Sequence, residues 1–74
     1  MDFVIQYFAR YDRFMFDERV EAEELVDALD RARVIVRESE PIADPYTNDE
    51  LQLIGFVILD SRGRQVARGY RRDV

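Results

Sequence analysis

The stretch that decides the fold is LQLIGFVILDSRGRQVARGYRRDV, residues 51–74. Its first half is apolar on both alternations of a strand: Leu51, Leu53, Val57 and Leu59 share one, and Ile54, Phe56 and Ile58 share the other. A strand with two apolar faces needs cover on both sides. DSRG, residues 60–63, is typical of a hairpin turn, with Gly63 where a positive φ is wanted. RQVARGYR, residues 64–71, is therefore predicted to return as the partner of a strand over 51–60.

The rest of the chain predicts a small α+β domain around this hairpin. DFVIQYFARY indicates a strand at about 2–10. RFMF, residues 13–16, indicates a short second strand with Phe14 and Phe16 inward and Met15 outward. From residue 17 the apolar residues recur at helical spacing, with Asp17 as the N-cap, and the segment 34–36 fits either helix or strand. We expect a single domain over 1–74 in the order β-β-α-β-β, with the helix across one face of an antiparallel sheet.

Several chemistries are excluded by residue types that the chain lacks. It has no Cys and no His, which removes disulfides, thiolate metal sites and the usual neutral-pH proton shuttle. Ser39 and Ser61 have neither His nor Lys to activate them. DPYTNDE, residues 44–50, lacks the alternating ligands and central Gly of a calcium loop. We therefore expect no enzyme activity, no catalytic residues, no cofactor and no metal.

Origin and location follow from composition. No stretch approaches about 18 consecutive apolar residues, and the N-terminus lacks the features of a signal peptide. We expect no contact with membranes and a cytoplasmic location. The chain has eleven Arg and no Lys, which indicates a high-GC genome, bacterial or phage. A phage protein would then work in the cytoplasm of its bacterial host.

Charge is spread unevenly in this acidic protein, whose net charge is −5. Residues 17–30 hold seven acids and one Arg, whereas residues 61–74 hold five Arg and one Asp. Charged partner contacts are expected at Glu23, Asp27, Asp30, Arg62, Arg64, Arg68, Arg71 and Arg72. The arginines also suit a nucleic-acid-binding hairpin, with Tyr70 stacking, although the net charge disfavours it. Arginines that protect a sheet edge, and acids that mimic phosphates, are further interpretations.

The second face of the sheet is the most informative feature. One helix covers one face of the sheet. The side-chain alternation expected along each strand places six apolar residues on the other face: Val4, Phe8, Met15, Ile54, Phe56 and Ile58. Contiguous apolar patches of this kind usually mark an interface. The segment 34–50, with Ile42, Pro45 and Tyr46, is the alternative cover. The leading hypothesis is a non-catalytic protein-binding module, a homodimer, that inhibits a host system by occupying a partner's surface.

Overall fold

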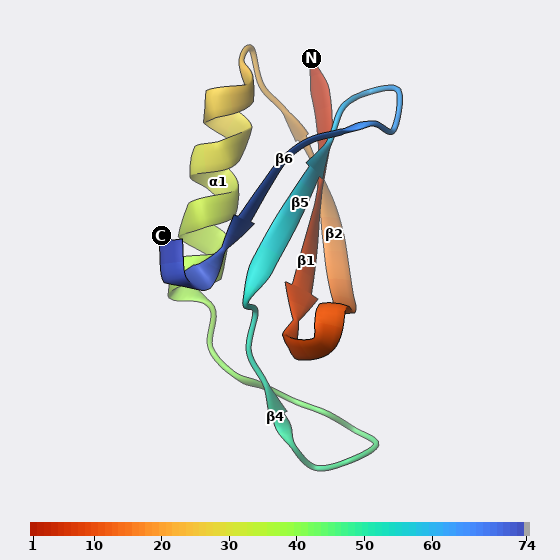
Figure 1. The fold of residues 1–74 in the computed structure, drawn as a ribbon, viewed down its shortest axis with the longest axis vertical. Coiled ribbons are helices and arrows are strands. Elements are labelled where there is room, and N and C mark those ends of the chain that lie inside the picture. Colours follow the sequence, from red (N-terminus) through yellow and green to blue (C-terminus); the bar gives the residue numbers. More distant parts are fainter. Residues whose placement is uncertain (74) are drawn as a thin grey trace.

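A computed structural model describes residues 1–73 and shows one helix against an antiparallel sheet (Figure 1). The strands are β1 (Asp2–Ala9), β2 (Arg13–Glu21), β3 (Ile42–Ala43), β4 (Glu50–Leu51), β5 (Gly55–Leu59) and β6 (Gln65–Tyr70). The helix is α1 (Leu25–Glu38), and two 3-10 turns, η1 (Arg10–Asp12) and η2 (Arg71–Asp73), follow β1 and β6. The predicted α+β class is confirmed. No helix within residues 1–73 has the length and apolar character needed to cross a membrane.

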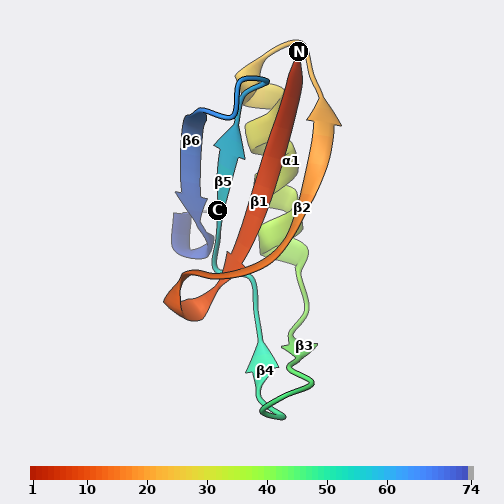
Figure 2. The ribbon, with the colours of Figure 1, turned by 90° about the vertical axis from the view of Figure 1, so that its right-hand side faces the viewer.

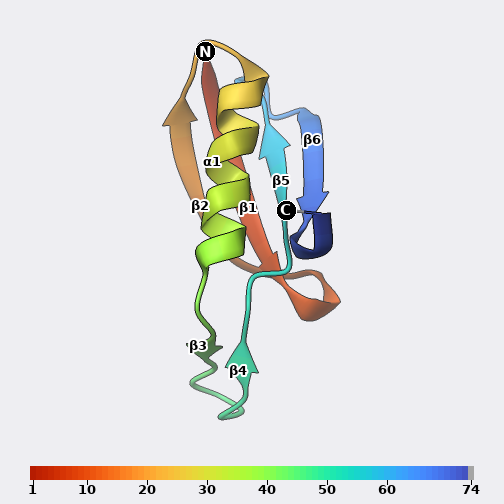
Figure 3. The ribbon, with the colours of Figure 1, turned by 90° about the vertical axis from the view of Figure 1, so that its left-hand side faces the viewer.

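The sheet has one covered face and one open face. Its four strands lie in the order β2-β1-β5-β6, and all neighbouring pairs are antiparallel. Figures 2 and 3 view it from opposite sides: α1 lies in front of the sheet in Figure 3 and behind it in Figure 2. Among residues 1–73, no second layer lies over the side turned to the viewer in Figure 2. We call this side the open face.

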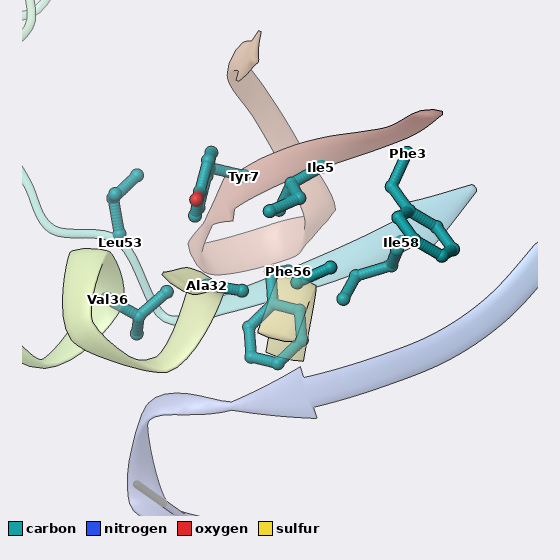
Figure 4. Close-up of a cluster of buried hydrophobic side chains, with 9 residues drawn as sticks. Phe3, Ile5, Tyr7, Ala32, Val36, Leu53, Phe56 and Ile58 are labelled. Atoms are coloured by element: carbon teal, nitrogen blue, oxygen red, sulfur yellow. The ribbon is translucent and has the colours of Figure 1, made fainter. Parts of the chain in front are cut away.

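The core lies between α1 and the sheet (Figure 4). Alternate residues of β1 point toward the helix, so Phe3, Ile5 and Tyr7 are all buried. The helix presents small residues, Ala28 and Ala32, which let its backbone approach the sheet closely. The full cluster is Phe3, Ile5, Tyr7, Ala28, Ala32, Val36, Leu53, Phe56 and Ile58.

The element order differs from the prediction between the helix and the last hairpin. Between α1 and β5 lie β3 and β4, which pair with each other as a separate two-stranded sheet. The long strand expected over 51–60 is therefore divided, because Leu51 pairs with Ile42 whereas Gly55 pairs with β1. Together β3, β4 and their turn extend beyond the four-stranded sheet (Figures 2 and 3).

The helix begins later than its sequence pattern predicts. Asp17 is not an N-cap, because β2 continues to Glu21 along the edge of β1. The α-amino group of Met1 donates to the carbonyl of Ala22 at 2.9 Å, and this bond ties the end of β2 to the start of the chain. Residues 34–36, for which both helix and strand were open, are helical. The acidic run therefore divides between a strand and a helix.

A bulge and the register of β5 overturn predicted side-chain orientations. The bulge, opposite Tyr7 and Phe8, pairs Phe8 with Phe14, so Phe14 lies on the open face and Met15 packs toward the core. The assignment of Phe56 and Ile58 to the open face is also wrong. They are 2% and 0% exposed and pack under α1, because they pair with Tyr7 and Ile5, which face the helix.

Candidate protein-docking surface

The open face is organised in rows that cross all four strands. Residues paired directly across antiparallel strands share a face, so the pairings place residues of β2, β1, β5 and β6 side by side. From the η1 end, the three rows are Phe14–Phe8–Gly55–Tyr70, Asp17–Gln6–Val57–Arg68 and Arg19–Val4–Leu59–Gln65. The two central strands of this surface are therefore apolar apart from Gln6, and its outer strands carry charge.

The apolar centre consists of Val4, Phe8, Val57 and Leu59. Val57 is 6% exposed, and the other three are half-buried, because neighbouring side chains pack along one another on the sheet. The aromatic row is more open: Phe14 is 51% exposed, and its ring meets that of Phe8 edge to face at 5.9 Å between centroids. Tyr70, at the other end of the row, is 37% exposed.

One end of this surface is hollowed. A hollow of about 310 Å³ lies there, and Asp2, Val4, Arg19 and Leu59 contribute to its walls. At the opposite end Gly55 has no side chain, but the Gly69 carbonyl oxygen and the Tyr70 ring lie where its Cβ would be, so almost no open space remains.

The β2 side of the molecule is held by a buried hydroxyl and an ion pair. The Tyr7 hydroxyl donates to Glu18 Oε1 at 2.8 Å, and Arg31 Nε from α1 donates to the same oxygen at 3.1 Å. Burial raises the pKa of Glu18, but hydrogen bonds from Arg31 and Tyr7 outweigh it and leave the pKa lowered. Burial, followed by the bond to Glu18, raises the pKa of Tyr7. These bonds join β1, β2 and α1 behind the open face.

The five C-terminal arginines do not form one cluster. Arg64 bonds Asp60 across the turn at 3.2 Å, and Arg71 donates to the carbonyl of Val36 at the end of α1. Arg68 and Arg72 lie 5.9 and 5.3 Å from the centre of the Tyr70 ring, within cation–π range. Arg62, in the turn, donates its backbone N–H to Asp60. Only Arg68 lies within the rows of the open face.

The predicted acidic contacts lie on the far side of the molecule. Glu23 precedes α1, and Asp27 and Asp30 lie on its exposed surface. Asp30 pairs with Arg33 at 3.7 Å, and Arg31 binds Glu18. Within residues 1–73, no three carboxylates group closely enough to hold a metal ion.

The structure divides the predicted interface residues. Val4 and Phe8 lie on the open face, whereas Met15, Phe56 and Ile58 lie on the core side. Ile54 lies just before β5, is half-buried and lines a pocket with Tyr70, Arg71 and Arg72. Sequence reasoning missed Val57, Leu59, Asp17 and Phe14, because their orientation depends on which strand pairs with which, and in which register.

A second apolar groove, of about 380 Å³, lies between α1, β2 and β3. Phe16, Ile35, Ile42 and Leu53 line it, and Glu38 and Glu40 flank it. Phe16 and Ile42 are 40% and 43% exposed. This groove has acids at its rim, unlike the apolar residues at the centre of the open face, so the two surfaces would suit different partners.

The chain matches no protein-family model, no curated protein and no solved structure.

Proposed function

We propose that this protein is a non-catalytic protein-binding module and that the open face is its docking surface. The observation that supports the proposal is that only one face of the sheet is covered. The helix α1 covers Phe56 and Ile58, whereas no element within residues 1–73 lies over Val4, Phe8 and Leu59. Solvent-facing apolar residues that adjoin one another across strands usually belong to an interface. Tyr70 and Arg68 at the margin are residue types enriched in such interfaces.

The proposal includes the way in which the module acts. With no activated nucleophile in its sequence, it would work by occupying a partner's surface. We place this action in the cytoplasm of a bacterial cell, where a protein encoded by a phage or a high-GC bacterium would inhibit a host system. All of the basic side chains are arginine and none is lysine, and this composition supports that origin.

Affinity purification from the native host tests the docking surface. Tagged wild-type protein serves as the bait, and untagged protein is also present. The tagged Phe8→Glu variant serves as the second bait. Phe8 is half-buried on the open face, so a charge there should remove any partner that docks on this face. A stoichiometric partner captured by wild type and lost with Phe8→Glu is the expected result.

Ile42→Glu is the matched control, because it places the same charge in the groove beside α1. Circular dichroism should first show that both variants are folded. A partner that is lost with Ile42→Glu and kept with Phe8→Glu would assign docking to the groove and overturn the proposal. Equal capture by all three baits would overturn it too.

Nucleic-acid binding through the last hairpin is a second candidate, supported by one observation. Arg68 and Arg72 both lie beside the Tyr70 ring, an arrangement that could stack a base and grip phosphate. Against it, Arg64 and Arg71 are already bonded within the fold. Binding to single-stranded oligonucleotides should then weaken steeply as salt rises. No binding at low salt would remove this candidate.

A further inference from the structure

We infer that the occupant of the open face is a second copy of this chain, related by a two-fold axis that runs parallel to the strands. The inference rests on the proposed docking surface and names its partner. Its evidence is the middle row of the open face, Asp17–Gln6–Val57–Arg68. This row begins with a carboxylate on β2 and ends with a guanidinium on β6, with Gln6 and Val57 between them.

Symmetry turns this row into a self-complementary one. A two-fold axis parallel to the strands, midway between β1 and β5, lays β2 of one copy over β6 of the other and keeps each row over itself. Asp17 of each copy then faces Arg68 of the other, so the dimer contains this pair twice. A two-fold axis across the strands, through the same row, would instead place Asp17 over Asp17 and Arg68 over Arg68. Charge therefore selects the axis parallel to the strands.

The aromatic row agrees with the same axis. Phe8 of one copy comes to lie over Gly55 of the other, where the strand has no side chain and the nearest atoms are the Gly69 carbonyl oxygen and the Tyr70 ring. Phe14 comes to lie over Tyr70, which joins two of the more exposed aromatic rings. Packed sheets are about 10 Å apart, a gap that these side chains and the pair of Asp17 with Arg68 can span.

The size of the face sets the expected affinity. Four strands at about 4.8 Å and about five residues at 3.3 Å give a footprint of roughly 19 by 17 Å per copy. This area, about 320 Å² per copy, is below the usual range of specific interfaces, so the dimer should be weak or transient. We therefore expect a dimer that dissociates in the micromolar range. Sedimentation equilibrium should be measured from about 1 to 500 µM.

Charge reversal tests the pairing of Asp17 with Arg68. Asp17→Arg and Arg68→Asp should each weaken the dimer by about tenfold or more, because each places like charges opposite one another twice. The double variant, Asp17→Arg with Arg68→Asp, restores opposite charges and should return the dissociation constant to within about threefold of wild type. Asp27→Arg and Arg33→Asp make the same charge changes on the exposed side of α1. They should leave the dissociation constant of the dimer unchanged.

The outcomes separate this inference from the proposed function. A wild-type protein that stays monomeric throughout the concentration range would overturn the second copy, while a Phe8-dependent partner from the host would still support the docking surface. A dimer that neither single reversal weakens, or that the double variant fails to restore, would overturn the pairing of Asp17 with Arg68. Circular dichroism of each variant shows that a weaker dimer does not reflect unfolding.

Discussion

At the scale of single residues, Gly69 shows how closely the sheet is packed beneath the helix. A Cβ placed there would lie 2.4 Å from the Phe56 ring, so the ring occupies the space that any larger residue needs. Phe56 is 2% exposed and has little room to move. We expect Gly69→Ala to lower the free energy of unfolding by about 1–3 kcal/mol, measured by urea denaturation.

The background Phe56→Leu separates this clash from an effect on the strand alone. Leu removes the ring atoms that the new methyl group would meet. Gly69→Ala should therefore cost less in the Leu background than in wild type, and the difference is the coupling energy of the two positions. An equal cost in both backgrounds would show that the ring is not the cause.

At the scale of elements, the sequence predicts types better than it predicts partners. The period of the apolar residues identifies a helix around Ala28 and Ala32, and DSRG identifies the last turn, where Gly63 has a φ of 79°. The length of β2 could not be predicted, because its last residues, through Glu21, pair with the start of β1 rather than starting the helix. Tertiary pairing there overrides local propensity.

The candidate site was harder to predict than the fold for a related reason. A strand that is apolar on both alternations does not show which set faces the helix, so Phe56 and Ile58 could be exchanged with Val57 and Leu59. Bulges shift the alternation again at Met15. By contrast, Val4 and Phe8 were correctly placed, because β1 has a more polar alternation that includes Gln6.

The C-terminus of α1 receives hydrogen bonds from Arg71, which lies near the C-terminus of the chain. Arg71 Nη1 donates to the carbonyl of Val36 at 2.6 Å and to Ser39 Oγ at 3.1 Å, and Nη2 donates to the carbonyl of Arg37 at 3.3 Å. A guanidinium at this position satisfies free carbonyls and complements the helix dipole. Arg71→Ala should lower the free energy of unfolding by about 1–3 kcal/mol.

Arg72→Ala is the matched control for this prediction. Arg72 is the exposed neighbour and contacts the Tyr70 ring rather than the helix, so its loss should change stability by less than about 0.5 kcal/mol. Both variants are compared by thermal and urea denaturation. Equal effects from the two substitutions would mean that the bonds of Arg71 to α1 contribute nothing to stability.

At the scale of the whole molecule, three hydrogen-bonded carboxylates in different parts of the fold share a response to acid. Glu18 connects β1, β2 and α1, and Asp60 accepts N–H groups within the last hairpin. Asp44, which is 2% exposed, pairs with Arg13 and ties the β3–β4 extension to β2. All three have a lowered pKa in the folded protein. Their ionised forms therefore favour folding.

The sign of the pH dependence follows from these lowered pKa values. The unfolded chain binds protons at these carboxylates at higher pH than the folded chain does, so stability is full above about pH 5 and falls as the pH drops below about 4. Urea denaturation at pH 7, 5, 4 and 3 measures this loss. A free energy of unfolding that stays constant down to pH 3 would contradict it.

Asp44→Asn measures how much of the loss of stability in acid is due to the carboxylate of Asp44. The backbone N–H of Tyr46, followed by Arg13, lowers the pKa of Asp44, and an amide oxygen can still accept the bond from Tyr46. The charge opposite Arg13 is lost, together with the hydrogen bond that Asp44 Oδ2 accepts from Arg13. The variant should be less stable than wild type at pH 7, and its stability should fall less between pH 5 and 3. The free energies of unfolding of the two proteins should therefore converge as the pH falls. If the two curves of stability against pH stayed parallel, the protonation of Asp44 would not be linked to unfolding.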